Sequence, residues 1–372
     1  MSSARGATLA QGFSQRLLLE VYDKSQLEVV VNRQYEGEIN KVGSKLNILN
    51  IARITERTYT GANLASADSL YENNCVLTID QWKSFYWQEL TIDNWESYIK
   101  DPHSTVVAQK ADERNKNMEA YVYGLYGDVG AGNRVGTDYT TGTVTVDVTT
   151  GLVTGSGTTF TSAMVGKGFK ATGHSLWYRV KTYTNATSIV IEDDFDDTTS
   201  AYTGGAIGAG ASYTIEAVTA VSITTSNILA KVGQLKLKLD KAESFGYSSV
   251  PEDGRFLLVP PEFEDVATNG ASGITLHVPA VYEDLVKRGM LTMLKGFKIF
   301  MSNRLTGDNT NGFHLIAGHP NWMTFAEKLL SADIEEEIIG NFGTAYKDLF
   351  VYGAKVPDSR RHFAAELFAT FA

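Results

Sequence analysis

The chain has 372 residues, which at roughly 150 residues per domain is enough for two to three domains. Apolar residues make up 43% and charged residues 20%, an ordinary globular composition that excludes a mainly disordered chain. The net charge of −10 disfavours a protein that binds nucleic acid through many phosphates, because that role needs a basic face.

Cysteine content and apolar runs exclude further classes. Cys75 is the only cysteine, so the chain can form neither an intrachain disulfide nor a zinc site built from thiolates. No apolar run reaches the roughly 18 residues needed to cross a bilayer. The first twenty residues also lack the charged start and apolar run of a signal peptide. We therefore expect a soluble protein with no membrane partner, stabilised by packing and by association.

The first zone, residues 1–130, opens with a predicted helix and a predicted hairpin. The helix is indicated by apolar residues at helical spacing: Phe13, Leu17, Leu18, Val21 and Tyr22. Residues 27–31 read as a brief extended run. Two strand-like stretches, 46–54 and 76–85, are separated by the polar stretch 59–74, which is too long for a tight turn. This pattern predicts a long two-stranded arm.

A longer helix is predicted over residues 101–127. Asp101 and Pro102 supply a cap and a first-turn proline, and Gly124 and Gly127 end the helix. Apolar side chains recur along one face: Val106, Val107, Ala111, Met118, Tyr121, Val122 and Leu125. About 20 helical residues would extend about 30 Å.

The second zone, residues 131–216, differs in composition. It is rich in glycine and threonine, contains no proline, and shows no helical periodicity. Short β runs at 143–148, 176–183, 188–192 and 212–215 alternate with glycine-bearing turns. We therefore expect a small all-β domain inserted into another domain.

The third zone, residues 217–372, returns to mixed structure. Helices are predicted over 228–239 and 279–287. Strands are predicted over 255–259, where Pro260 and Pro261 stop the run, and over 297–301 and 349–356. Helices and strands mixed around one core indicate the α+β class.

Motifs that would carry chemistry are weak. Gly130, Gly132 and Gly136 miss the dinucleotide fingerprint by one residue, and the residues after Gly136 are β-like, not helical. Lys167 is followed by Gly168 instead of the Ser or Thr of a phosphate loop. No Gly-x-Ser-x-Gly elbow occurs. We therefore predict no catalytic residue, no cofactor site and no enzyme activity.

Two clusters are candidate metal sites, but a simpler interpretation suits each better. His314 and His319 are five residues apart, which misses the one-face spacing of a helical metal pair, so polar loop residues around Pro320 are the preferred interpretation. The acidic run 192–197 offers carboxylates for calcium but lacks the glycine turn and distal glutamate of a calcium loop. A solvated acidic loop is preferred there, and no metal site is predicted.

Aromatic residues gather between residues 82 and 98: Trp82, Phe85, Tyr86, Trp87, Trp95 and Tyr98. Such residues suit a ligand platform, a subunit contact or a core. The neighbouring hairpin favours a subunit contact, because a long two-stranded arm is marginally stable alone in water and should lie on something.

With these elements in order, the chain resembles the major capsid proteins of tailed bacteriophages with the Hong Kong 97-type fold. The N-terminal resemblance lies in residues 29–48 (VVVNRQYEGEINKVGSKLNI), followed by the arm and the helix after Asp101. In the third zone it lies in residues 254–261 (GRFLLVPP), 289–305 (GMLTMLKGFKIFMSNRL) and 349–356 (LFVYGAKV).

The resemblance implies a division of the chain. Residues 1–130 would form the N-terminal arm, an extended loop at about 42–89, and the spine helix at about 101–127 of a peripheral domain. Residues 131–216, including 153–170 (VTGSGTTFTSAMVGKGFK), look like the small β modules inserted in several phage structural proteins. Residues 217–372 would form the axial domain and a final strand that returns to the peripheral domain.

The resemblance also implies a function and partners. The chain would be the coat subunit of a tailed double-stranded DNA phage, forming hexamers and pentamers of an icosahedral shell in the host bacterial cytoplasm and residing in the virion capsid. Its partners would be itself, a portal, a scaffolding protein, a decoration or cement protein where one is used, and packaged DNA contacted non-specifically. Some members crosslink an arm lysine to an asparagine, but no lysine lies between Lys45 and Lys83, so we expect a shell without crosslinks.

Subunit-interface residues are expected in the N-terminal helix, the arm and the aromatic cluster: Phe13, Leu17, Tyr22, Tyr59, Leu64, Leu70, Tyr71, Trp82 and Trp87. Two other functions stay open. A phage tail or surface adhesion protein that binds glycans through its β module would explain the Thr- and Gly-rich zone but not the arm and the long helix. A hydrolase with an unrecognised site is the weaker alternative.

Overall fold

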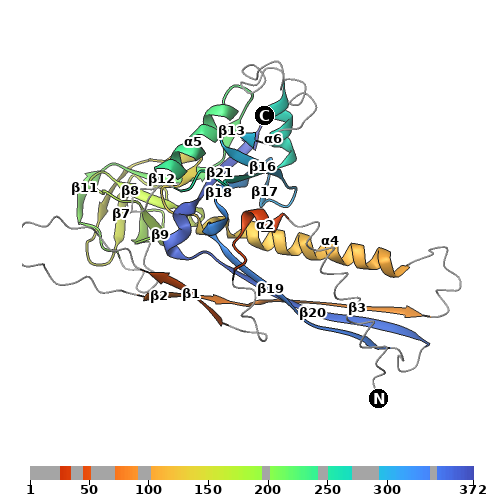
Figure 1. Cartoon of the computed structure of the whole chain (residues 1–372). Helices are drawn as coiled ribbons and strands as arrows, with labels where there is room; N and C mark the ends of the chain where they lie inside the picture. The colour runs from red at the N-terminus through yellow and green to blue at the C-terminus, as the bar shows by residue number, and fades with distance from the viewer. Residues whose placement is uncertain are drawn as a thin grey trace, which may run out of the picture.

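The computed structural model describes residues 26–34, 45–51, 72–90, 102–194, 202–241, 250–269, 293–335 and 342–372. Within these ranges the strands form four sheets, with few helices, which confirms the predicted α+β class. A long helix and a three-stranded sheet extend together away from two larger sheets (Figure 1). Among the described residues, no helix combines the length and apolar character that crossing a membrane requires.

The central sheet has the strand order β13-β21-β18-β14-β16-β15, with β17 added to β18 and β4 to β21. Its strands are β4 (Arg134–Val135), β13 (Val221–Ile223), β14 (Phe256–Val259), β15 (Met293–Leu294), β16 (Phe297–Met301), β17 (Gly307–Asp308), β18 (Gly312–Gly318) and β21 (Ala364–Phe371). The strands predicted at 255–259 and 297–301 are confirmed. The whole of β14 is buried, as its uninterrupted apolar run requires.

Two helices pack on the central sheet: α5 (Ile228–Asp240) and α6 (Pro261–Thr268). Val232 and Leu235 of α5 share a core with Leu257 and Leu367 of the sheet. The helix predicted at 228–239 is therefore confirmed. Pro261 stands in the first turn of α6, so the prolines that end β14 also begin a helix. The helix predicted over 279–287 lies outside the described residues.

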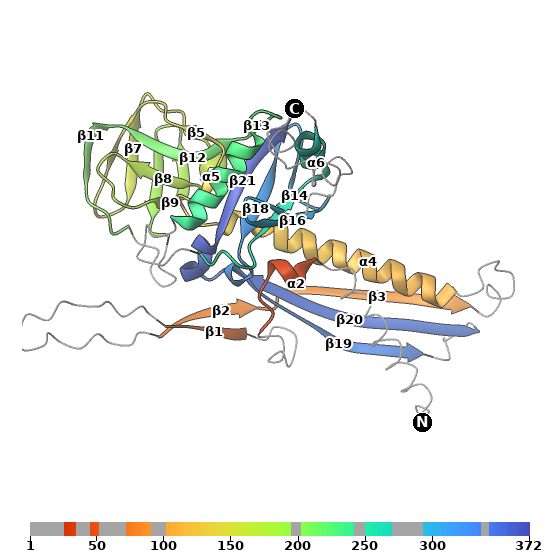
Figure 2. The same cartoon turned by 45° about the horizontal axis from the view of Figure 1, so that its top comes forward.

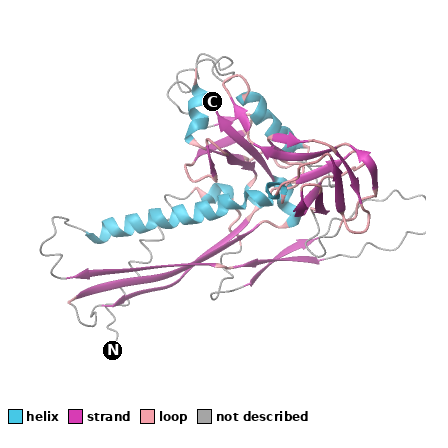
Figure 3. Ribbon diagram, turned by 180° about the vertical axis from the view of Figure 1, so that it is seen from behind, coloured by secondary structure: helices cyan, strands magenta, loops and turns pink. Residues whose placement is uncertain are grey.

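The long sheet consists of β19 (Thr324–Glu335), β20 (Gly343–Lys355) and β3 (Gln81–Leu90), in that antiparallel order. Helix α4 (Pro102–Tyr123) runs along it and continues into the 3-10 turn η2 (Gly124–Asp128), which confirms the helix predicted after Asp101 (Figure 3). The strand predicted at 349–356 is confirmed but begins earlier. Strand β20 pairs with β3 on one side and with β19 on the other, whereas the final strand, β21, lies in the central sheet.

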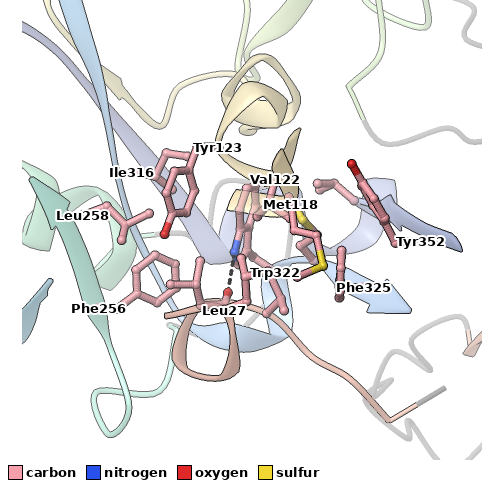
Figure 4. Close-up of a cluster of buried hydrophobic side chains, with 14 of the residues drawn as sticks. Leu27, Met118, Val122, Tyr123, Phe256, Leu258, Ile316, Trp322, Phe325 and Tyr352 are labelled. Carbon is pink, nitrogen blue, oxygen red and sulfur yellow. Dashed lines mark hydrogen bonds between the residues drawn. The ribbon is translucent and has the colours of Figure 1, made fainter. Parts of the chain in front are cut away.

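One core joins the long sheet to the central sheet. Met118 and Val122 of α4 meet Phe256 and Ile316 of the central sheet, and Trp322 lies at their centre with no exposed surface (Figure 4). The Trp322 indole Nε1 donates to the Val30 carbonyl oxygen at 2.9 Å. Trp322 belongs to the short 3-10 turn η5 (Pro320–Trp322), which leads the chain from the central sheet into β19.

The residues around Val30 correct one prediction. Residues 27–31 read as an extended run, but Leu27–Val30 form the one-turn helix α2. Leu27 and Val30 are both buried, and one helical turn places residues three apart on the same face. Packing in this core decides the local structure, since a short apolar run does not distinguish a strand from a buried helical turn.

A two-stranded sheet, β1 (Lys45–Ile51) and β2 (Glu72–Thr78), lies beside the long sheet (Figure 2). Its antiparallel pairing confirms the predicted arm strands. The single strand predicted over 76–85 is wrong in one respect: the chain leaves β2 at Thr78 and enters β3 at Gln81 in a different sheet. Asp80 stands at the break, where its carboxylate accepts a hydrogen bond from the Tyr121 hydroxyl at 3.2 Å.

The fourth sheet has the order β11-β6-β7-β10-β9-β8-β12-β5 and is called the β5–β12 unit below. Its strands are β5 (Thr137–Tyr139), β6 (Thr143–Val146), β7 (Leu152–Ser156), β8 (Gly168–Ala171), β9 (Tyr178–Asn185), β10 (Ser188–Glu192), β11 (Ile207–Ala211) and β12 (Tyr213–Thr219), with the 3-10 turn η3 (Ser162–Met164). The four β runs predicted in this zone correspond to β6, β9, β10 and β12. The unit has its own core, including Phe169, Ile189 and Ile215.

Candidate assembly surfaces

The long sheet has two chemically different faces. Phe85 and Trp87 lie on the α4 side, where the Lys110 ammonium stands 5.3 Å and 5.7 Å from their ring centroids. Successive side chains of a strand point to opposite faces, so Trp82 and Tyr86 point away from α4. They are 60% and 61% exposed. Large exposed aromatic side chains on one sheet face are typical of a surface that binds another protein.

A buried ion pair holds α4 on its face of the long sheet. Arg114 Nη2 donates to both carboxylate oxygens of Asp348 at 3.1 Å and 3.0 Å, and both side chains are almost fully buried. The guanidinium lies 4.2 Å from the centroid of the Phe350 ring. The Phe85 backbone N–H also donates to Asp348 at 3.1 Å. Helix, central strand and edge strand are thus joined at one carboxylate.

The two-stranded sheet is seated on the opposite face. Leu46, Ile48 and Leu77 form a small core with Ala326 and Val351 of the long sheet. Trp82 is the direct cross-strand partner of Val351, so its indole lies on the same face, beside this core. Beyond the two-stranded sheet the face continues outward with Tyr86, which stays exposed.

A buried charge cluster joins the β5–β12 unit to the central sheet. Arg134 Nε lies 3.9 Å from Glu216 of β12 and 3.5 Å from Glu366 of β21. Glu216 also accepts the backbone N–H groups of Gly132, at 2.8 Å, and Arg134, at 3.2 Å. Lys167 Nζ lies 3.6 Å from Glu366. Since paired and hydrogen-bonded charges are the form in which proteins tolerate burial, these contacts define a fixed joint.

The same cluster shifts the pKa of both glutamates. Burial raises the pKa of Glu216 to about 7, against the attraction of Arg134 and Lys238. Burial acts the same way on Glu366, but Arg134 and a hydrogen bond from His314 outweigh it and lower its pKa to about 2. The prediction that His314 is a loop residue is wrong, because His314 lies in β18. Its ring stacks on Tyr126 with centroids 3.8 Å apart, and its Nδ1 is hydrogen-bonded to Glu366 at 2.6 Å.

A second ion pair closes the joint. Asp194 accepts the Ala131 backbone N–H at 2.6 Å and pairs with Arg361 at 3.0 Å. Its side chain has no exposed surface, and Arg361 belongs to the 3-10 turn η6 (Asp358–Phe363) before β21. The interpretation of the acidic run as a solvated loop is therefore wrong for Asp194. Burial raises the pKa of Asp194, opposed by Arg361.

Two of the predicted interface residues fall among the described residues. Trp82 is exposed on the face of the long sheet that points away from α4, the open face. Trp87 is half-buried under α4 and stacks on Tyr346 with ring centroids 4.8 Å apart. The others lie outside the described residues: Phe13, Leu17, Tyr22, Tyr59, Leu64, Leu70 and Tyr71.

Tyr86 belongs to the predicted aromatic cluster but not to the predicted interface residues, and the charge cluster of the joint was not predicted at all. Strand alternation from Trp82 would have placed Tyr86 on the same face, so a signal existed. No comparable signal exists for Arg134, Glu216 and Glu366, which are far apart in the sequence and meet only in the fold. Among the described residues, no group of histidine, cysteine and acidic side chains could hold a metal ion.

The comparisons with known proteins identify the fold. No family model matches the sequence, and no curated protein matches it. A solved structure from Mycobacterium phage Che8 is similar over 94% of this chain and 91% of that chain, with a TM-score of 0.54 and 16% identity. The capsid of Ralstonia phage GP4 is similar over 93% and 88%, with a TM-score of 0.52 and 10% identity. The chain therefore has the fold of a tailed-phage major capsid protein.

Proposed function

We propose that this protein is the major capsid protein of a tailed double-stranded DNA bacteriophage, which assembles with copies of itself into hexamers and pentamers of an icosahedral shell. The observation that carries the proposal is the open face of the long sheet. Trp82 and Tyr86 expose most of their aromatic surface there, next to a two-stranded sheet that rests on this same face. A surface of this kind is stabilised when a second copy covers it.

The shape of the molecule supports the same function. Helix α4 and the long sheet form a thin, extended layer, and the two-stranded sheet adds a second extension (Figures 1 and 3). Thin layers bury little apolar surface of their own, so contacts repeated between subunits would supply the rest. The role is structural rather than catalytic, in keeping with the fold.

The finer assignments belong to the same proposal. We propose residues 1–130 as arm, extended loop and spine helix, 131–216 as an inserted β domain, and 217–372 as the axial domain with strands that return beside the helix. The proposed partners are further copies of the chain, a portal, a scaffolding protein, a decoration or cement protein where one is used, and packaged DNA contacted non-specifically. Assembly would take place in the host cytoplasm.

The test is assembly of the purified chain with Trp82 and Tyr86 both replaced by serine. In negative-stain electron microscopy at rising concentration, we expect the natural chain to form rings of five or six, tubes or closed shells. We expect the W82S/Y86S chain to stay unassembled, with its free energy of unfolding changed by less than about 1 kcal/mol because both side chains are exposed. Tyr183→Ser is the matched control, since Tyr183 is an aromatic residue 37% exposed on the β5–β12 unit.

Two outcomes would contradict the proposal at different levels. Assembly of the W82S/Y86S chain at the natural concentration would show that the open face is not the contact. Uniform monomers of the natural chain at every concentration, even with crowding agents, would contradict the capsid function itself. The phage tail or surface adhesion protein would then be the next function to test.

A further inference from the structure

The β5–β12 unit contains a hollow on its surface, away from the open face of the long sheet. The hollow has a volume of about 290 Å³ and lies between paired strands β8 and β12 and the turn after β8. Lys170, Thr172, His174, Trp177, Ser212 and Thr214 are among the residues that line it. Concave sites with a few convergent polar groups are where small ligands bind.

The lining has an unusual chemical character for a chain with a net charge of −10. None of the described residues that line the hollow is acidic. Thr172, Ser212 and Thr214 contribute hydroxyl groups, which both donate and accept hydrogen bonds. Lys170 contributes an ammonium group, and Trp177 contributes an indole ring that is only half-buried. This combination suits a ligand with several hydroxyl groups, an apolar ring face and a negative charge.

Positive charge converges on the indole ring from two elements. Lys170 Nζ lies 5.9 Å from the centroid of the Trp177 ring, and Lys238 Nζ of helix α5 lies 5.8 Å from it. Each ammonium group is also held by a carbonyl oxygen: Lys170 donates to Ser175 at 3.0 Å and Lys238 donates to Gly132 at 2.6 Å. Of the two, only Lys170 lines the hollow, so its ammonium is the positive charge that a ligand there would meet.

The walls of the hollow are held in place by contacts outside it. His174 Nδ1 accepts the Ala171 backbone N–H at 3.3 Å, and its Nε2 is hydrogen-bonded to the Tyr202 hydroxyl at 2.7 Å. Trp177 is packed against Gly132, where an added Cβ would lie 2.6 Å from the ring. A site whose side chains are already ordered loses little conformational entropy when a ligand binds.

We propose that this hollow binds one acidic sugar unit, a pyranose that carries a carboxylate. The carboxylate lies near the Lys170 ammonium, and the sugar hydroxyl groups pair with Thr172, Ser212 and Thr214. The site is independent of the proposed capsid function, because it lies on a unit with its own core and uses none of the residues of the open face.

The test is a titration of the full-length chain with three probes, monitored by saturation-transfer NMR. Glucuronate carries charge and hydroxyl groups, glucose carries hydroxyl groups only, and acetate carries charge only. We expect glucuronate to bind with a Kd on the order of 1 mM and the other two at least about tenfold more weakly. Lys170→Met should weaken glucuronate about tenfold and leave glucose unchanged, while Ser212→Ala with Thr214→Val should weaken both sugars.

Lys181→Met is the matched control, because Lys181 lies on β9 of the same unit and pairs with Glu192 outside the hollow. We expect this variant to bind glucuronate like the natural chain. Equal binding of acetate and glucuronate would leave an anion site without sugar recognition and would overturn the proposal. Absence of saturable glucuronate binding, or equal loss in the Lys170 and Lys181 variants, would overturn it as well.

Discussion

The β5–β12 unit and the long sheet differ in how far their own residues bury their apolar side chains. The unit closes a core of its own, with Phe169, Ile189 and Ile215 almost fully buried among residues of the same unit. The long sheet covers one face with α4 and leaves Trp82 and Tyr86 exposed on the other. Among the described residues, one region therefore buries its apolar side chains within itself, whereas the other leaves large aromatic side chains exposed.

The two regions also differ in where they bury charged side chains. In the long sheet, the buried pair of Arg114 and Asp348 joins helix α4 to strand β20. In the β5–β12 unit the core is apolar. The buried charges lie where the unit contacts the central sheet, and there Arg134 and Lys167 pair with Glu366. Buried charge thus fixes how layers sit on one another, and apolar packing stabilises each layer.

The largest expected effect tests the thin layer. Arg114→Met leaves Asp348 buried without its cation, so we expect a loss of about 3–5 kcal/mol in the free energy of unfolding. Urea denaturation of the full chain measures it. Lys116→Met is the control, since Lys116 pairs with Glu113 on the exposed side of α4 and should cost less than about 1 kcal/mol. Equal losses in the two variants would mean that the ion pair does not hold the layer together.

Acid pH tests the joint. The lowered pKa of Glu366, about 2, contributes stability above pH 4.5 that is lost as pH falls from 4.5 toward 2. Burial lowers the pKa of His362 to about 4, so its contribution is lost between pH 6.5 and 4. Glu216, with its pKa raised to about 7, acts in the opposite direction: its contribution is full below pH 4.5 and lost toward pH 7. The net loss should therefore be steepest below pH 4.5.

Urea midpoints between pH 7 and pH 2.5 measure this dependence. Glu366→Gln should flatten the acid limb, because the group that takes up the proton is gone. Glu252→Gln should leave the limb unchanged, since Glu252 is an exposed partner of Lys236. A Glu366→Gln chain with the natural acid limb would assign the acid sensitivity to other groups.

The smallest expected effect concerns a surface network on the long sheet. Lys347 pairs with Asp333 and Glu335 across β19 and β20, and all three side chains are about half exposed. Solvent and salt screen such pairs, so Lys347→Met should leave the urea midpoint unchanged at physiological ionic strength. A clear shift, present at low salt and absent at 1 M salt, would give this network a larger part in the layer than its exposure suggests.

The sequence predicts elements whose pattern is long or bounded by clear signals. Helix α4 is predicted by its apolar stripe and Pro102, and β14 by an apolar run that ends at Pro260. The one-turn helix α2 could not be predicted, because four residues carry too little periodicity. The division between β2 and β3 also escaped prediction, since an alternating pattern does not say which sheet a strand joins.

The functional surfaces were predictable in part. The aromatic cluster predicted a contact surface, and Trp82 is exposed, but only the pairing with β20 shows that Trp87 faces α4. Asp194 looked solvated because its neighbours in the sequence are acidic. Its partner Arg361 lies 167 residues further along the chain, and a contact of that separation leaves no trace in local composition.

The packing of the two-stranded sheet against the long sheet can be monitored in solution. The only thiol of the chain, at Cys75, is 3% exposed in the small core between β2 and the long sheet. A thiolate reacts only when a reagent reaches it, so this side chain is modified when the two sheets separate. The rate of alkylation, measured by the mass of the intact chain, therefore reports how often β1 and β2 separate from the long sheet. No engineered label is needed.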